Sequence, residues 1–319
     1  MVYAFAFLLS LAIMLVITPE LRKIAYKIDY VEKPKQENTR KIHKEAKPYL
    51  AAVGIFTVFW IVYFLFSKEL TTKTIWIFIS SCLIFLVGMI DDWVKIRGGD
   101  LKAWPKMMIQ VLACILVYAG GVQFIGFTNP FNGGYILLPT MLQAILTVVW
   151  IFGVTTVINF TDGMDGLAGG VSCISAFTLF IVACGKGNAN AALMGIILVG
   201  VCLGYVRYNK FPAKILMGDA GATFLGFMLA IISLDGAFKQ ATIISIFIPI
   251  LALGLPIFDN LYVMYMRMKQ GKPLYVGDTS QVHFRLVQNG LTQKQAVQVL
   301  YLVSMCLNLS AIILFMLKI

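Results

Sequence analysis

The sequence predicts an all-α protein that crosses a membrane many times. Of its 319 residues, 60% are hydrophobic and only 13% are charged, and the mean hydropathy is +0.85. A typical soluble domain has about a quarter of its residues charged, so this composition excludes an ordinary soluble protein. Apolar windows of about 17–25 residues, the length needed to cross the hydrocarbon core, recur along the whole chain. Since no long polar segment could fold separately, we expect one integral membrane domain over residues 1–319.

The apolar windows predict about ten membrane spans. They lie near residues 1–18, 49–66, 74–90, 107–126, 140–158, 167–184, 189–206, 221–238, 241–262 and 297–317. The first lacks a basic start and a small-residue cleavage site, which favours a retained span over a signal peptide. The six cysteines all fall in apolar runs without close pairs. They are therefore expected to pack as small hydrophobes, with no disulfide framework or zinc site.

The basic residues predict the orientation of these spans, because cytoplasmic loops carry an excess of Lys and Arg. One set of alternate loops, which begins with 19–48 and 91–106, holds 21 of the 26 basic residues. We expect this set to be cytoplasmic, with both termini on the outer side. Thirteen of the fifteen acids lie on or beside the same face; Glu69 and Asp235 are the exceptions. Topology and attraction to anionic membrane lipid explain the net charge of +11, so the charge does not indicate a nucleic-acid partner.

Residues 159–170, Asn-Phe-Thr-Asp-Gly-Met-Asp-Gly-Leu-Ala-Gly-Gly, stand between two expected spans. Ionised side chains at membrane depth are costly and tend to mark function. Asp162 and Asp165 are three residues apart and would point roughly the same way on a starting helix, and Asn159 adds a neutral oxygen. Helix capping is the structural alternative, but capping requires one acid rather than two. A cation or a phosphate is the expected partner.

A second acidic pair, Asp91 and Asp92, closes the third expected span. Neighbouring residues of a helix point roughly 100° apart, so one carboxylate would face a reaction centre while the other holds a lysine or a metal. The alternative is a pair of interface charges, although acids at a helix C-terminus oppose its dipole. Lys95 and Lys106 follow closely. They are expected either to anchor the loop at the membrane surface or to bind phosphate.

Two later stretches carry further candidates. Asp219 would stand at the N-terminus of the eighth span. There it would be either an N-cap or a magnesium ligand, since Mg²⁺ needs only one or two carboxylates besides substrate phosphates. In the last polar loop, His283 lies two residues before Arg285. A loop histidine is ordinarily surface decoration, but this pair could instead bind a pyrophosphate. Asp259 is expected to anchor the ninth span against a basic neighbour.

Taken together, these motifs resemble those of the polyprenyl-phosphate N-acetylhexosamine-1-phosphate transferases, the multi-spanning enzymes that start lipid-linked teichoic acid, O-antigen and peptidoglycan. The matching residues are Ile90-Asp-Asp92, Asn159-Phe-Thr-Asp-Gly-Met-Asp-Gly-Leu167, Met217-Gly-Asp219-Ala-Gly and Val282-His-Phe-Arg-Leu286. The basic segment Arg40-Lys-Ile-His43 agrees as well, and makes His43 an expected substrate-binding residue.

The chain departs from the family pattern at two places. The usual Gly-Gly after the basic segment is here Val53-Gly54. The GlcNAc-type branch typically has His-x-His-His-Arg-Leu where this chain has Gln281-Val-His-Phe-Arg-Leu286. The Arg-Leu ending is more similar to the UDP-GlcNAc enzymes than to the UDP-MurNAc-pentapeptide translocase, whose histidine triplet is followed by Phe-Glu.

The resemblance implies an enzyme of the bacterial cytoplasmic membrane that transfers a sugar-1-phosphate from a UDP-sugar to undecaprenyl phosphate and releases UMP. GlcNAc-1-phosphate is the first candidate group, and phospho-MurNAc-pentapeptide transfer is the alternative. The implied cofactor is Mg²⁺, with Mn²⁺ as a substitute, and a homodimer is an open possibility. A lipid or solute transporter is the rival class, but transporters place their charged sites at the midplane between repeats, and this chain shows neither.

The resemblance also implies roles for the candidate residues. Asp219, helped by Asn159, would hold the metal on the diphosphate. Asp91 or Asp92 would deprotonate or orient the lipid phosphate, and Lys95 and Lys106 would neutralise phosphate oxygens. Asp162 and Asp165 would position the nucleotide or order the metal shell, and His283 and Arg285 would clamp the pyrophosphate. A double displacement through a phospho-aspartate remains the competing mechanism.

Overall fold

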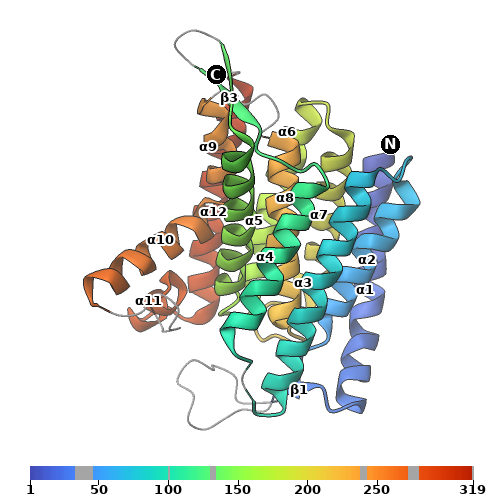
Figure 1. The fold of residues 1–319 in the computed structure, drawn as a ribbon. Helices are drawn as coiled ribbons and strands as arrows, with labels where there is room; N and C mark the ends of the chain where they lie inside the picture. The colour runs from blue at the N-terminus through green and yellow to red at the C-terminus, as the bar shows by residue number, and fades with distance from the viewer. Residues whose placement is uncertain (33–45, 100, 130–133, 238–242, 272–279, 318–319) are drawn as a thin grey trace.

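The computed structural model describes residues 1–319 except 33–45, 100, 130–133, 238–242, 272–279 and 318–319. Long helices run side by side along most of the molecule (Figure 1). The helices are α1 (Val2–Lys27), α2 (Ala51–Phe66), α3 (Thr72–Ile96), α4 (Ala103–Ala119), α5 (Thr140–Thr161), α6 (Leu167–Gly185), α7 (Ala189–Asn209), α8 (Gly218–Ala237), α9 (Ile243–Ala252), α10 (Gly254–Lys269), α11 (Val282–Gln288) and α12 (Gln293–Met316). The strands form two short antiparallel pairs, β1 (Val31–Glu32) with β2 (Lys47–Pro48) and β3 (Gly126–Thr128) with β4 (Tyr135–Leu137).

The helical, multi-spanning class predicted from the sequence is confirmed. Among the described residues, seven helices are long and apolar enough to cross a membrane, and the bent pair α9–α10 would make eight. The helices α2 and α4 coincide with predicted spans but are shorter, at 16 and 17 residues. The total of ten and the side on which the termini lie stay predictions. The two strand pairs join helices and were not predicted.

The ninth predicted span, 241–262, is not one straight helix. The axes of α9 and α10 differ by 83°, and α10 points away from the bundle (Figure 1). The residue responsible is Pro256, which has no N–H to donate to the carbonyl of Ala252, four residues earlier. That carbonyl accepts instead from Ser175 Oγ at 2.6 Å and Asn308 Nδ2 at 3.2 Å. These side chains satisfy a backbone group that lipid could not, so the bend is built into the packing.

The bundle is organised around α8. Of its best 18-residue window, 94% is buried, against 22% for the windows of α1 and α12, which face outward. The helix α3 packs tightly against α8 at Gly88, where a Cβ would collide with the backbone of Ala220. Asp91 and Asp92 lie about one turn beyond Gly88, and Asp219 directly precedes Ala220. The close helix contact therefore brings the acidic motifs of α3 and α8 together.

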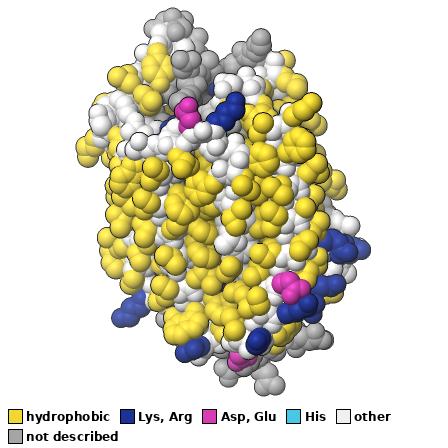
Figure 2. All heavy atoms as spheres, turned by 90° about the vertical axis from the view of Figure 1, so that its right-hand side faces the viewer, with side chains coloured by type: hydrophobic (Ala, Val, Ile, Leu, Met, Phe, Trp, Pro, Cys, Tyr) yellow, Lys and Arg dark blue, Asp and Glu magenta, His cyan; other side chains and the backbone are white. Residues whose placement is uncertain are grey.

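The surface agrees with a membrane environment. Hydrophobic side chains form a broad band around the middle, and Lys and Arg side chains gather at the lower end (Figure 2). Both termini lie at the upper end in Figure 1. Near that upper end Asp235, one of the two acids outside the acidic face, forms an ion pair with Lys73 at 2.6 Å.

Candidate active site

Four charged side chains from three helices form one cluster at the lower end of the bundle. Lys95 Nζ lies 2.8 Å from Asp91 Oδ2 and 2.9 Å from Asp219 Oδ2. Lys106 Nζ, from α4, lies 2.8 Å from Asp91 Oδ2 and also contacts Asp219 Oδ2. Two ammonium groups thus bridge two carboxylates. Asp91 and Lys95 are four residues apart on α3, a spacing that places them on one helix face.

The cluster opens to solvent on one side. The side chain of Asp91 is 3% exposed, whereas those of Asp219 and Lys95 are 23% and 40% exposed. Asp91 therefore forms the floor of the cluster, and Asp219 and Lys95 face an arriving ligand. An anionic ligand would meet the two ammonium groups here, and a cation would meet Asp219.

Asp92 has a different environment from its neighbour. It is fully buried, and its two oxygens accept hydrogen bonds from the backbone N–H groups of Asp219 at 2.8 Å and Ala220 at 3.0 Å. A carboxylate in this position caps the first turn of α8 and complements its dipole. Gly218 makes the approach possible, because its φ is +63° and a Cβ there would run into the Asp92 carboxylate. Asp92 holds the helix that carries Asp219.

Asp162 ends α5 and adds a further negative group to the same end of the bundle. Burial, together with the negative charges of Asp219, Asp92, Asp165 and Glu32, raises the pKa of Asp162 to about 8. A carboxyl group in this condition is stabilised in its charged form by a bound cation. Several carboxylates therefore gather near Asp162, and a cation bound among them would interact favourably with their negative charge.

Asp165 is held in the protein interior. Its Oδ2 accepts from the backbone N–H of Ala213 at 2.8 Å and from Lys47 Nζ at 3.2 Å. The side chain has no exposed surface. Asp165 therefore ties three separate segments together, namely the loop before α6, the strand β2 and the chain that leads into α8.

The donor set determines whether a metal fits. Within the described ranges, no three His, Cys, Asp or Glu side chains are placed to form a metal cage. Magnesium, however, is usually held by one or two carboxylates together with waters and substrate phosphates. Asp219 offers a partly exposed carboxylate, and Asp162 lies within its electrostatic influence. These residues fit a metal that binds together with a diphosphate.

The remaining predicted metal ligand, Asn159, lies half-buried on the last turn of α5. Its carbonyl accepts from the Asp162 N–H at 3.2 Å. In the described structure its side chain makes no hydrogen bond with the Asp91–Asp219 cluster. His43, predicted to bind substrate, lies outside the described residues.

The predicted pair His283 and Arg285 lies on α11. His283 is 1% exposed and packs against Gly163, where a Cβ would collide with its Nε2. Burial lowers the pKa of His283 to about 4, so the ring is neutral at pH 7. Arg285 lies 3.5 Å from Asp259 Oδ1, with its guanidinium 4.2 Å from the centre of the Tyr262 ring. The prediction that Asp259 anchors against a basic neighbour is confirmed, and His283 is a packed side chain rather than surface decoration.

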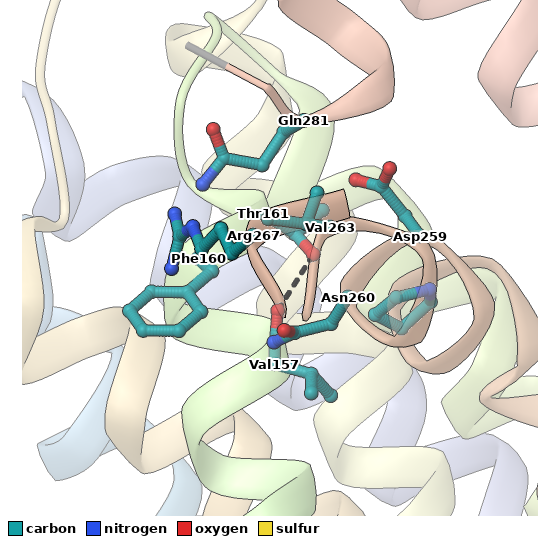
Figure 3. Close-up of a pocket in the computed structure, with 9 residues that line it drawn as sticks. Val157, Phe160, Thr161, Asp259, Asn260, Val263, Arg267 and Gln281 are labelled. Carbon is teal, nitrogen blue, oxygen red and sulfur yellow. Dashed lines mark hydrogen bonds between the residues drawn. The ribbon is translucent and has the colours of Figure 1, made fainter. Parts of the chain in front are cut away.

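A narrow polar hollow separates the end of α5 from α10 (Figure 3). Its walls are Val157, Phe160, Thr161, Pro256, Asp259, Asn260, Val263, Arg267 and Gln281. Thr161 Oγ1 turns back to donate to the Val157 carbonyl at 2.8 Å (Figure 3). The hollow measures about 10 Å³, room for roughly one water molecule. In this conformation it places polar groups beside the helix end that carries Asp162, without space for a sugar.

Comparison with known families shows which family the chain belongs to. The sequence model of glycosyl transferase family 4 matches residues 74–237, which include Asp91, Asp162 and Asp219. The chain belongs to this family.

Curated relatives within glycosyl transferase family 4 match almost the whole chain. A Bacillus subtilis (strain 168) protein named "Probable undecaprenyl-phosphate N-acetylglucosaminyl 1-phosphate transferase" is 35% identical, over 97% of this chain and 84% of its own. The undecaprenyl-phosphate alpha-N-acetylglucosaminyl 1-phosphate transferase of Yersinia pestis is 25% identical, over 97% and 82%. The phospho-N-acetylmuramoyl-pentapeptide-transferase of Streptococcus thermophilus (strain CNRZ 1066) is 28% identical, over 82% of each chain.

Three side chains that support the site of this family member were not predicted from the sequence. Lys47 pairs with Asp165. Asn209 accepts from the Gly166 N–H at 2.8 Å and donates to the Ile215 carbonyl at 2.9 Å. Tyr301 of α12 donates to the Gly166 carbonyl at 2.5 Å. Asn209, like Asn159, is a polar residue at the end of an apolar run, and this signal could have identified it.

Proposed function

We propose that this protein transfers a sugar-1-phosphate, GlcNAc-1-phosphate in the first place, from a UDP-sugar to undecaprenyl phosphate, with release of UMP. The observation that carries the proposal is the cluster in which Lys95 and Lys106 bridge Asp91 and Asp219 where three helices meet. Family membership and the names of the relatives support the reaction. The product would be the lipid-linked starting unit of a bacterial cell-envelope glycan.

The two lysines would bind phosphate oxygens. Both substrates are anions, so their approach requires positive charge at the reacting phosphorus. In the structure the two ammonium groups are neutralised by Asp91 and Asp219. A bound phosphate would take over part of this pairing, while Asp91 keeps both lysines aimed at the opening.

A divalent metal fits beside the lysines. Asp219 would hold it, with Asn159 as the predicted helper and Asp162 near enough to add charge. Mg²⁺, or Mn²⁺ in its place, would supply charge neutralisation to the diphosphate. Asp165 would act through its neighbours, because its contacts with Ala213 and Lys47 keep the loop before α6 and the chain before α8 together. A clamp of His283 and Arg285 on the pyrophosphate stays a prediction: in the structure His283 is buried against Gly163 and Arg285 pairs with Asp259.

The acids of α3 divide their roles by environment. Both Asp92 oxygens accept hydrogen bonds from backbone N–H groups of α8, so we propose that Asp92 positions Asp219. Asp91, beside both lysines, is the candidate to orient or deprotonate the lipid phosphate for in-line attack. If a phosphoryl group could be trapped on Asp91 with UDP-sugar alone, the mechanism would be a double displacement rather than this single displacement.

The proposed setting is a bacterial cytoplasmic membrane. Ten apolar segments would cross it, with both termini outside and the cluster on the cytoplasmic face, where the basic loops gather. α2 and α4 would count as short spans, and α9–α10 as a broken one. The single-domain and homodimer predictions belong to this proposal as well.

The test is UMP release by the purified protein with undecaprenyl phosphate, Mg²⁺ and a panel of UDP-sugars. We expect release with UDP-GlcNAc, since the motif Gln281–Leu286 in the last polar loop ends in Arg-Leu, as in the UDP-GlcNAc branch. Release with UDP-MurNAc-pentapeptide alone would favour the alternative branch of the family. Absence of UMP with every donor, combined with lipid or solute movement in liposomes, would replace the enzyme with a transporter.

A further inference from the structure

A basic hollow at the lower end of α1 has no part in the reaction proposed above. It measures about 240 Å³ and is lined by Thr18, Pro19, Arg22, Lys23, Tyr26, Tyr208, Lys214 and Ile215. None of these residues belongs to the Asp91–Asp219 cluster. The α1 residues recur at spacings of three and four, so they form one face of the helix. The other wall comes from the end of α7 and the segment that leads into α8.

Pro19 and Tyr208 fix the two walls of the hollow relative to each other. A proline inside a helix cannot donate to the carbonyl four residues earlier, here that of Leu15. Tyr208 OH donates to this carbonyl at 2.9 Å. The bond satisfies a backbone group at membrane depth and fixes Tyr208 against α1. The hollow is therefore a defined feature of the α1–α7 contact.

The hollow carries positive charge. Arg22, Lys23 and Lys214 line it, and Lys23 pairs with Glu20 on the same helix at 2.8 Å. Among the described residues, neither Arg22 nor Lys214 forms an ion pair with a carboxylate. The guanidinium of Arg22 lies 5.8 Å from the centre of the Tyr26 ring, which keeps it at the rim. Two cations are thus available for an anionic group.

An apolar stripe leads to these cations. Phe5, Leu8 and Val16 are 60%, 56% and 72% exposed, and they continue the helix face that bears Pro19 and Lys23. On this side of the molecule the hydrophobic band ends at basic side chains at the lower edge (Figure 2). A ligand that matches both parts has an apolar tail and an anionic head. Basic pockets between helices at a membrane surface commonly hold such lipid headgroups.

We propose that this hollow binds the headgroup of an anionic phospholipid, with the acyl chains along Phe5, Leu8 and Val16. The bound lipid would lie against Lys214 and Ile215, which are four and three residues before the start of α8, the helix that carries Asp219. The site would therefore brace the segment that leads into the cluster without contacting the reacting groups. This inference stands independently of the sugar that is transferred.

The test measures phosphatidylglycerol binding to the purified full chain by native mass spectrometry, with phosphatidylcholine as the neutral lipid. The test variant is R22Q/K214Q. The matched control is K27Q/K269Q, which removes two exposed cations from the same end of the bundle but outside the hollow. We expect one phosphatidylglycerol to bind more tightly than phosphatidylcholine. Affinity should fall about 25-fold in R22Q/K214Q, at about fivefold per cation, and less than about threefold in the control.

Two further arms, and the comparison of the two charge-removing variants, keep the result decisive. The charge-preserving variant R22K/K214R should bind like wild type, which separates loss of charge from misfolding. Inorganic phosphate should not displace the lipid at millimolar concentration, because it lacks the tail; displacement would overturn the lipid assignment in favour of a phosphate site. Equal losses in the two charge-removing variants would show diffuse attraction to the basic face and refute the site.

Discussion

Substitution of Asp92 by Asn tests whether this carboxylate caps α8. The two oxygens accept the N–H groups of Asp219 and Ala220 at 2.8 and 3.0 Å. The Asn side chain keeps one acceptor oxygen, but its NH₂ group would face the other backbone N–H, so one of the two hydrogen bonds is lost. The loss of one charged hydrogen bond inside the protein costs about 1.5–3 kcal/mol. The lost interaction with the helix dipole adds up to about 2 kcal/mol in a partly buried setting.

We therefore expect D92N to lose roughly 3–4 kcal/mol of stability, which corresponds to a fall in Tm of about 6–8 °C. The assay is thermal unfolding of the detergent-solubilised protein followed by intrinsic fluorescence. E20Q is the control, because it removes a carboxylate from an exposed ion pair with Lys23 and should change stability by less than about 0.5 kcal/mol. A D92N protein that unfolds within about 1 °C of wild type would refute the capping role.

Three further predictions concern individual groups of the site. K106Q should lower kcat/KM for UMP release at least about 100-fold, because it removes a cation that would bind the substrate phosphates. The control K102Q, at the exposed N-cap of the same helix, should change kcat/KM by less than about threefold. Similar losses in both variants would show that Lys106 is not part of the site. Asp162 has its pKa raised to about 8, so its burial destabilises the fold increasingly as the pH rises from 4 to 8; D162N should therefore raise Tm more at pH 8 than at pH 5, and an equal gain at both would contradict the raised pKa. Burial lowers the pKa of His283 to about 4, so below about pH 6.5 this histidine is protonated in the unfolded chain but stays neutral in the folded protein. Stability should therefore fall as the pH drops from about 6.5 to about 4, and H283Q should flatten this part of the profile of Tm against pH. An unchanged profile would show that His283 is not neutral in the folded protein.

The helices could be predicted from the sequence because apolar windows report the thickness of the membrane. The same averaging hid the bend after Ala252, since Pro256 is one residue in a window that remains apolar. The positions of the acids at helix ends were also visible. Because these acids all lie on the same face of the predicted membrane domain, we expect them to come together. In the structure Lys95 and Lys106 bridge two of them, Asp91 and Asp219.

The sequence could not predict which carboxylate of each acidic pair takes which role. Asp91 and Asp92 are adjacent, and only the packing of α3 on α8 at Gly88 decides which one meets the lysines and which one caps a helix. Asp165 likewise finds Lys47, 118 residues away along the chain, through a contact that no local pattern encodes. Spacing along one helix indicated a common direction, but tertiary contacts separated the two roles.

The most direct test of the account is UMP release from UDP-GlcNAc and undecaprenyl phosphate by wild type and D219N across a Mg²⁺ titration. Wild type should depend on the metal, lose activity in EDTA and recover when Mg²⁺ is restored. D219N should remain inactive at every Mg²⁺ concentration while keeping a folded, monodisperse elution profile. Near-normal turnover of D219N at saturating Mg²⁺ would contradict the claim that helix ends assemble a metal-assisted phosphate site around Asp219.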